Sequence, residues 1–242
     1  MLLPFIICAK IVTSEVIDKM KEGMRFLTNH YQLREFTLNR MLEIIKQQSR
    51  ATKGGVVFFG DSLTQYCDLN KYYSEIGDVY NCGIAGITSK MLLNFIDEGV
   101  IKYEPSKVVI MVGTNDLGDT VMESPRDIAL NIKEMVELIH YNCSNCKIYL
   151  VSAIPCVENI QSYKALKKGL RSNDVLKMLF KEFKNIIPYE YVNFINVYNS
   201  LCNKKGNVIE DYYLDGLHIN EKGYEILCGV IKDKLLGDFN EN

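Results

Sequence analysis

The chain has 242 residues, of which 48% are hydrophobic and 24% are charged. This composition excludes a disordered or fibrous chain, and the length allows one domain with a sizeable core. The formal net charge of −2 at pH 7 lacks the basic field that draws proteins onto nucleic acid or anionic membranes. We therefore expect neither among the partners of this chain.

The region up to about residue 50 has the pattern of helices. Residues 14–48 contain no proline and a single glycine, and apolar residues recur there at helical spacing. This predicts an N-terminal helical extension over residues 1–50. Its surplus of apolar side chains favours packing on the core or against a second copy of the chain, so a homo-oligomer formed through these helices is one expected assembly.

The apolar N-terminus and the scattered cysteines bear on location. The first nine residues are apolar, but they are about half as long as a membrane span needs, and no positive charge precedes them as in a secretory signal. Several of the eight cysteines lie in apolar runs, which suits a reducing compartment. We expect a cytoplasmic protein without an export signal or stable membrane insertion.

One cysteine pair is close in sequence. Cys143 and Cys146 have the spacing of half a zinc site or of a redox pair. No second pair follows at zinc-site spacing, and no thioredoxin-like pattern surrounds the two residues, so ordinary packing is favoured. The sequence leaves a redox role for the pair open.

After residue 53, short apolar runs alternate with helical stretches. The runs are residues 56–59, 79–82, 108–112, 148–153 and 192–197, and the helical patterns are residues 88–101, 124–141, 172–187 and 220–236. Continuous apolar runs indicate strands buried on both faces, so the alternation predicts a five-stranded parallel sheet covered by helices. Residues 51–242 would form this single domain, with the active site at the carboxyl ends of the strands.

Four polar clusters follow the predicted strands or open a predicted helix. They occupy residues 60–63, 81–86, 113–116 and 215–218. Because the carboxyl ends of parallel strands lie at one edge of a sheet, we expect the four clusters to meet there.

The first and last clusters can supply a serine nucleophile and its base. A serine hydroxyl needs a neighbouring base, and the base needs an orienting acceptor. Of three histidines, His218 alone lies in a strand-end cluster, and Asp215 precedes it by three residues, so one turn of loop carries both side chains to the same side. We therefore predict Ser62 as nucleophile, His218 as base and Asp215 as orienter.

The two middle clusters can supply donors for the oxyanion of acyl transfer. Gly86 can bring its backbone N–H close because it has no Cβ, and Asn115 can supply a side-chain amide. The backbone N–H of Ser62, at a strand-to-helix turn, would be a third donor. Each cluster taken alone could be an ordinary turn or helix cap, and only their joint occurrence at strand ends favours a catalytic site.

Together the four clusters resemble the signature blocks of the SGNH or GDSL-type esterases and lipases, a family of acylhydrolases. The family is named for four residues in separate blocks, which here would be Ser62, Gly86, Asn115 and His218, with Asp215 completing the triad. The resemblance runs from about residue 53 to residue 236, and Gly-Asp-Ser-Leu, Gly-Thr-Asn-Asp and Asp-Gly-Leu-His occur in family order. It implies a flavodoxin-like three-layer α/β/α sandwich and neither a metal ion nor an organic cofactor.

The chain departs from the family pattern directly after Gly86. Relatives often have an acidic or polar residue there, whereas this chain has Ile87. Because the role expected of Gly86 uses only its backbone, we expect the departure to change substrate contacts and not the oxyanion site.

The leading function hypothesis is hydrolysis of a carboxylic ester through an acyl-serine intermediate. No long apolar lid is evident, which favours a small acyl group, acetyl above all, on a carbohydrate or another soluble alcohol. Candidate substrate contacts are Asp61, Asp116 and Tyr163.

Three alternatives stay open at this point. The chain could be a lysophospholipase or thioesterase of the same family, since loops choose among these substrates. It could be a carbohydrate- or lipid-binding module that has lost catalysis. A metal-dependent phosphoesterase could use Asp61, Asn115, Asp116 and His218, although no further histidines lie near this edge of the sheet.

Overall fold

The computed structural model of the protein describes residues 35–118, 121, 123–160 and 171–237. The chain divides into two units, residues 1–38 and 39–242, and the fold is described for the second unit. Of the helical extension expected over residues 1–50, helix α2 (Glu35–Gln48) is described, while residues 1–34 lie outside the described part of the chain. The hypothesis that these helices mediate oligomerisation stays a prediction.

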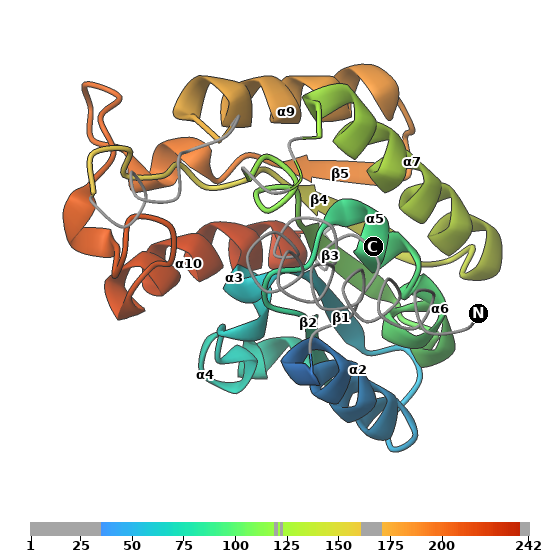
Figure 1. Ribbon diagram of the computed structural model, residues 1–242. Coiled ribbons are helices and arrows are strands. Elements are labelled where there is room, and N and C mark those ends of the chain that lie inside the picture. The colour runs from blue at the N-terminus through green and yellow to red at the C-terminus, as the bar shows by residue number, and fades with distance from the viewer. Residues whose placement is uncertain (1–34, 119–120, 122, 161–170, 238–242) are drawn as a thin grey trace, which may run out of the picture. The chain divides into compact units, whose positions relative to one another are not determined.

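Five parallel strands form one sheet in the order β2-β1-β3-β4-β5, as the apolar runs predict (Figure 1). They are β1 (Val56–Gly60), β2 (Val79–Gly83), β3 (Lys107–Met111), β4 (Lys147–Val151) and β5 (Val192–Ile195). Every residue of β1 and β3 is buried, because these strands have neighbours on both sides and helices over both faces. Gly60 pairs with Gly83 of β2 and with Met111 of β3, so three strands end at the same level.

Two apolar cores cover the two faces of the sheet and make a three-layer α/β/α sandwich. Side chains alternate along β1, so that Val57 and Phe59 enter one core and Val56 and Phe58 enter the other. Helices α7 (Pro125–Asn142) and α9 (Asn173–Ile186) cover the first core, and α10 (Glu221–Gly237) covers the second (Figure 1). This arrangement confirms the predicted fold class.

The remaining described helices are short. They are α3 (Ser62–Gln65), α4 (Leu69–Tyr73), α5 (Ser89–Leu93), α6 (Ile96–Gly99), and the 3-10 turns η1 (Ser74–Ile76), η2 (Ile101–Tyr103), η3 (Tyr198–Leu201) and η4 (Glu210–Tyr212). All eight are five residues long or shorter, and the polar clusters lie among or beside them.

The single helix expected over residues 88–101 is wrong, because α5, α6 and η2 occupy this stretch as separate pieces. The chain bends at Phe95, which is buried in the core. Beyond the bend, Gly99 approaches the ring of Phe59 so closely that a Cβ on it would lie 2.5 Å from a ring carbon. Packing against the sheet thus overrides the helical periodicity of this segment.

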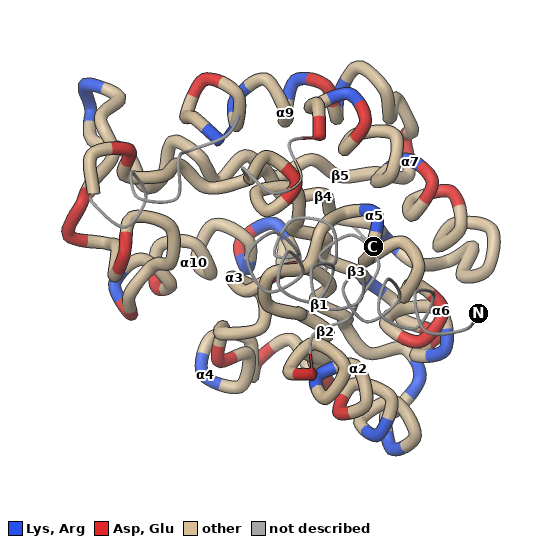
Figure 2. The backbone as a smooth tube through the Cα atoms, in the orientation of Figure 1, with Lys and Arg blue, Asp and Glu red and all other residues tan. Residues whose placement is uncertain are grey.

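The outer helices carry charges of both signs. Figure 2 shows Lys or Arg and Asp or Glu interspersed along α2 and α7, as expected for solvated faces. None of the helices in the described part of the chain is long and apolar enough to cross a membrane.

Candidate active site

The end of β1 holds Ser62 in a tightly packed strand-to-helix turn. A Cβ on Gly60 would lie 2.2 Å from the backbone oxygen of Met111, so no larger residue fits there without movement of the sheet. Asp61 then caps helix α3, and its carboxylate accepts the backbone N–H of Leu63 at 2.9 Å. Ser62 is the first residue of α3 and is only 5% exposed. Its position is therefore fixed by the sheet.

Asp215 and His218 lie on a loop that its own hydrogen bonds hold in shape. One carboxylate oxygen of Asp215 accepts the backbone N–H groups of Leu217 at 2.9 Å and of His218 at 2.7 Å. The other oxygen lies 2.7 Å from Nδ1 of His218. The backbone of Gly216 is left-handed, with φ of +87°, which a residue with a side chain adopts only with strain. The spacing of three residues thus brings both side chains to the same side, as predicted.

The pKa of Asp215 shows how its environment favours the charged form. Partial burial acts to raise this pKa, but the hydrogen bonds from the side chain and backbone of His218 and from the backbone of Leu217 outweigh it. The pKa of Asp215 therefore lies below its ordinary value. A carboxylate that is charged at neutral pH can hold the proton of His218 on Nδ1.

The first and last clusters meet at the sheet edge. Oγ of Ser62 lies 3.0 Å from Nε2 of His218, although the two residues are 156 positions apart. Because the Asp215 carboxylate can only accept, Nδ1 of His218 carries a hydrogen and Nε2 is left to accept from the Ser62 hydroxyl. The three side chains thus form a continuous hydrogen-bonded chain.

The two middle clusters are hydrogen-bonded to each other beside these three side chains. Ile84 donates its backbone N–H to the carbonyl of Gly60 at 2.9 Å, which anchors the second cluster to the end of β1. Gly86 follows with a left-handed φ of +73°, and it is exposed. Nδ2 of Asn115 donates to the carbonyl of Ile87 at 3.0 Å. An amide nitrogen has two hydrogens, so the second hydrogen of Asn115 can serve a substrate.

Two predicted substrate contacts are buried. Asp61 is 1% exposed, and Asp116 is fully buried and accepts from the backbone and the hydroxyl of Ser89. Burial raises the pKa of Asp61 to about 6 and the pKa of Asp116 to about 7, because a carboxylate loses its hydration inside the protein. These placements suit support of the loops better than contact with substrate. The third candidate, Tyr163, lies in residues 161–170, outside the described part of the chain.

Three residues near the site were not found from the sequence. The ring of Tyr66 lies 5.8 Å from the ring of His218, with 57% of the residue exposed, and Leu214 beside Asp215 is 72% exposed. Arg171 is buried, donates from Nε to the carbonyl of Thr114 at 2.9 Å, and acts to lower the pKa of Asp61. Of these residues, only Tyr66 could have been found from the sequence, because it follows Ser62 by one helical turn and would lie on the same side of the helix.

Asn81 of the edge strand β2 supports helix α3 through side-chain hydrogen bonds. Nδ2 of Asn81 donates to the carbonyls of Thr64 at 2.8 Å and of Cys67 at 3.1 Å. Asn81 is held in turn by Arg40 of α2, which donates to the carbonyl of Asn81 at 2.8 Å and to the carbonyl of Gly83 at 2.9 Å. The element that carries Ser62 is thus tied to β2 and, through it, to α2.

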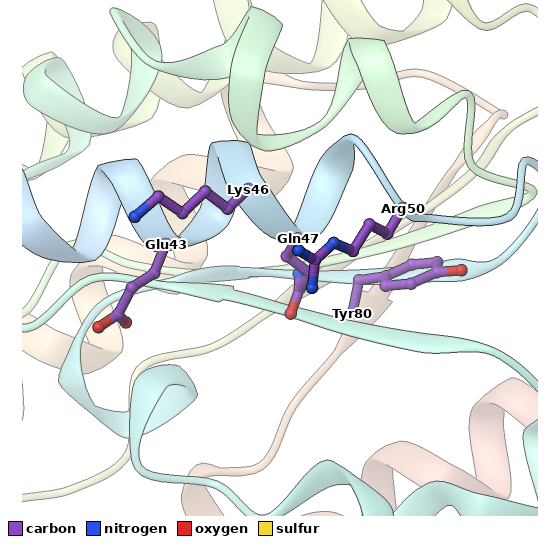
Figure 3. Close-up of a pocket in the computed structure, with 5 residues that line it drawn as sticks. All are labelled: Glu43, Lys46, Gln47, Arg50 and Tyr80. Carbon is purple, nitrogen blue, oxygen red and sulfur yellow. The ribbon is translucent and has the colours of Figure 1, made fainter.

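The described residues have few groups suited to binding a metal ion, and they form a pocket away from Ser62. No group of three or more His, Cys, Asp or Glu side chains among them is arranged to hold a metal, and Asp61 and Asp116 are both engaged in other hydrogen bonds. A pocket of about 430 Å³ between α2 and β2 is lined by Glu43, Lys46, Gln47, Arg50 and Tyr80. Figure 3 shows how these five side chains lie. None of the three hydrogen-bonded residues Ser62, His218 and Asp215 lines this pocket, so it is separate from the candidate site.

Comparison with known proteins identifies related sequences. Residues 58–226 match the GDSL-like Lipase/Acylhydrolase family. The chain is 30% identical to an N-acylneuraminate cytidylyltransferase of Escherichia coli over 179 residues, which are 74% of this chain and 39% of that protein. It is 22% identical to the platelet-activating factor acetylhydrolase IB subunit alpha1 of Rattus norvegicus over 185 residues, which are 75% of either chain.

Solved structures share the fold. A GDSL-like lipase from Bacteroides thetaiotaomicron superimposes with a TM-score of 0.67 at 23% identity, covering 82% of this chain and 98% of that one. A carbohydrate acetylesterase from Sinorhizobium meliloti superimposes with a TM-score of 0.64 at 19% identity, covering 76% and 99%. The family match spans well over half of the chain and contains all four clusters. The chain therefore belongs to the GDSL-like lipase and acylhydrolase family.

Proposed function

We propose that this protein hydrolyses carboxylic esters with Ser62 as nucleophile, His218 as general base and Asp215 as the residue that orients the base. The observation that carries the proposal is the continuous chain of hydrogen bonds, 3.0 Å from Ser62 to His218 and 2.7 Å from His218 to Asp215. A serine hydroxyl gains nucleophilicity only when such a base takes its proton. The membership of the acylhydrolase family agrees with this chemistry.

The steps follow from the positions of the three side chains. As Oγ of Ser62 attacks the ester carbonyl carbon, Nε2 of His218 takes the hydroxyl proton and then delivers it to the departing alcohol oxygen. Water then attacks the carbonyl carbon of the acyl-serine. His218 takes a proton from this water and delivers it to Oγ of Ser62, and the carboxylic acid leaves. Asp215 stabilises the imidazolium that forms in each half of the reaction.

We assign three hydrogen-bond donors to the oxyanion that develops on the carbonyl oxygen of the ester. They are the backbone N–H groups of Ser62 and Gly86 and the second amide hydrogen of Asn115. The first N–H groups of a helix have no intrahelical partner, so that of Ser62 is free to bind a developing charge. The bond from Asn115 to the carbonyl of Ile87 fixes the orientation of its amide relative to the loop of Gly86. Preorganised donors of this kind typically contribute about a hundredfold or more to the rate.

For the substrate we favour a small acyl group, acetyl above all, on a carbohydrate or another soluble alcohol. The names of a relative, an acetylhydrolase, and of a structural neighbour, a carbohydrate acetylesterase, support the acetyl group and the sugar. Tyr66 supports the alcohol part, because an exposed aromatic ring beside the base that protonates the leaving alcohol offers an apolar face to a sugar. A lysophospholipase or thioesterase is the alternative within the family.

A series of p-nitrophenyl esters of increasing acyl length tests the chemistry and the acyl size together. We expect acetate to be hydrolysed with the highest kcat/KM and Ser62→Ala to be inactive on every ester. A preference for long acyl chains would favour the lipase-like alternative. Labelling of the wild-type chain, but not of Ser62→Ala, by a fluorophosphonate is also expected. An unlabelled wild-type chain would favour a binding module that has lost catalysis.

A further inference from the structure

The thiols of Cys67 and Cys228 touch, although the residues are 161 positions apart. Their sulfur atoms lie 3.4 Å from each other in a hydrogen bond. Cys67 follows helix α3 and is partly exposed, while Cys228 lies buried in the middle of α10. We propose that this pair is an oxidisable dithiol that closes reversibly into a disulfide and thereby slows the reaction at Ser62.

The pair differs from the cysteines that are close in sequence. Cys143 and Cys146 lie in a turn, and their thiols point to the backbone carbonyls of Ile101 and Lys147, at 3.9 and 3.7 Å. Cys146 is also buried, which raises the pKa of its thiol to about 12. The fold thus brings together two cysteines from its first and last thirds, a contact that the sequence spacing does not indicate.

The geometry needs little change to form the bond. A disulfide has a sulfur-to-sulfur distance of about 2.05 Å, so the two atoms must approach by roughly 1.4 Å. Rotation of the side chains can supply part of this approach. The carbonyl of Cys67 is held by Asn81 at 3.1 Å and its N–H by the carbonyl of Thr64 at 3.2 Å, so the rest of the displacement is passed to α3.

The surroundings also favour thiolate chemistry at one of the two sulfurs. The hydrogen bond from Cys67 lowers the pKa of Cys228, helped by a hydrogen bond with Tyr73 and by the positive charge of Lys232, and it raises the pKa of Cys67. The thiolate is the reactive form of cysteine. The partly exposed Cys67 gives an oxidant access to the pair.

The oxidant is a hydroperoxide. One thiol loses its proton, the thiolate attacks a peroxide oxygen, the O–O bond breaks, and the departing hydroxide takes up a proton, so that a sulfenic acid and one water form. The second thiol then attacks the sulfenic sulfur, which forms the S–S bond and releases a second water. In sum, two thiols lose two electrons and two protons to hydrogen peroxide, and two waters form. A thiol reductant reverses the oxidation by thiol–disulfide exchange.

The disulfide would act on the site through α3. This helix has four residues, begins at Ser62, and is followed by Tyr66 against His218 and then by Cys67. A pull on Cys67 toward α10 is therefore a pull on the element that positions the nucleophile. Because displacements of about an ångström can cost a hundredfold in rate, we expect at least a threefold fall in kcat/KM.

The test uses the full chain, reduced, freed of reductant and titrated with hydrogen peroxide. Mass mapping under non-reducing conditions is expected to find one peptide pair that joins Cys67 to Cys228 and lacks two hydrogens. In parallel, kcat/KM on p-nitrophenyl acetate should fall and should recover with dithiothreitol. Cys67→Ser should lose both responses and keep its basal activity, while Cys202→Ser, at another partly exposed cysteine, should keep both.

Three results would overturn the proposal. In the first, peroxide oxidises Cys67 to a sulfinic acid without any link to Cys228. In the second, the disulfide forms while kcat/KM stays constant. In the third, peroxide lowers the activity of Cys67→Ser to the same extent as that of the wild type. The activity measurement rests on the proposed esterase function, whereas the mass mapping does not. A chain without basal esterase activity would therefore count against the proposed function and would leave the disulfide directly measurable.

Discussion

Two regions supply the proposed triad, and different forces hold them in place. The turn after β1 is packed into the sheet, with Ser62 5% exposed and Gly60 against the backbone of Met111. The loop around Asp215 and His218 is more open, with 46% of the Asp215 side chain and 29% of the His218 side chain exposed, and internal hydrogen bonds keep its shape. The nucleophile is thus placed by the core and the base by local bonding. Mutations should therefore cost more stability in the first region than in the second.

The largest expected effect is the loss of the nucleophile. Ser62→Ala should lower kcat on p-nitrophenyl acetate by about 10⁴-fold or more, because the remaining groups only bind substrate and the oxyanion. The matched control is Ser74→Ala, an exposed serine on η1, which should retain wild-type activity. Steady-state kinetics on both variants is the measurement. Substantial turnover by Ser62→Ala would remove the first region from the mechanism.

Removal of the charge in the second region should have the next largest effect. Asp215→Asn should lower kcat by about a thousandfold or more, because the neutral amide no longer holds the hydrogen of His218 on Nδ1. The unfolding free energy at neutral pH should fall only slightly, since the Asp215 side chain is 46% exposed and solvent screens its interactions. Asp174→Asn is the control, as the side chain of Asp174 is 95% exposed and makes only a loose ion pair. A variant that loses stability together with activity would contradict the difference between the regions.

Glycine replacements compare the two regions directly in stability. Gly60→Ala should cost about 1–3 kcal/mol or more in unfolding free energy, because its Cβ would meet the Met111 backbone at 2.2 Å. Gly216→Ala should cost about 1–2 kcal/mol, mainly because its φ of +87° is left-handed. Gly229→Ala on α10, where a Cβ meets no atom within 4 Å, should be neutral or stabilising. Urea unfolding measures all three, and equal losses at Gly60 and Gly216 would erase the contrast.

The buried Asp61 makes the first region sensitive to pH. Its pKa is raised to about 6, so the folded protein binds a proton that the unfolded chain releases at lower pH. The contribution of Asp61 is therefore fully present below the ordinary pKa of an aspartate and is lost as the pH rises through about 6. The unfolding free energy of Asp61→Asn, taken relative to that of the wild type, should therefore be higher at neutral pH than at a pH of about 4, by on the order of 1–3 kcal/mol.

Urea unfolding of both proteins across this pH range is the measurement. The comparable substitution in the second region, Asp215→Asn, should have the opposite trend, because the pKa of Asp215 is lowered and its contribution is lost on acidification. The two variants should thus differ in the sign of their pH dependence. A parallel response would show that burial does not dominate at Asp61.

The smallest effect is expected where the two regions meet. Tyr66→Ala removes the exposed ring beside His218 and should lower kcat/KM on sugar acetates by about two- to tenfold, the usual worth of an aromatic contact. The effect on p-nitrophenyl acetate should be smaller if the ring contacts the alcohol. Tyr141→Ala, at an 86% exposed tyrosine on α7, is the control. Equal losses on both esters would point to a role in placing His218 instead.

Much of the fold followed from the sequence because buried parallel strands leave continuous apolar runs. All five strands lie where these runs predict, and the cluster after each of the first three strands marks the sheet edge. The contact between Ser62 and His218 was also predictable, since strand ends converge. The break of the helix over residues 88–101 was not, because it depends on how Gly99 meets Phe59 in space.

Within the site, polarity was a poor guide to exposure. Asp116 lies in a polar cluster, and only the fold reveals that Ser89 binds its carboxylate inside the protein. Arg171 belongs to no motif, and its bond to the carbonyl of Thr114 joins residues 57 positions apart. The contact between Cys67 and Cys228 is equally long-range. Local patterns carry information on turns and periodicity, whereas such contacts are set by the packing of distant segments.

The hydrogen bonds from Arg40 to β2 limit how far the protein can be truncated from its N-terminal side. The family match starts at residue 58, yet Arg40 on α2 holds the carbonyls of Asn81 and Gly83 on an edge strand. A recombinant fragment that starts at the first strand would lose this clamp, together with Met41 and Ile44 from the core. Its uncovered edge would be a template for strand-to-strand association. We therefore expect the smallest fragment that folds by itself to begin upstream of the signature blocks, within α2.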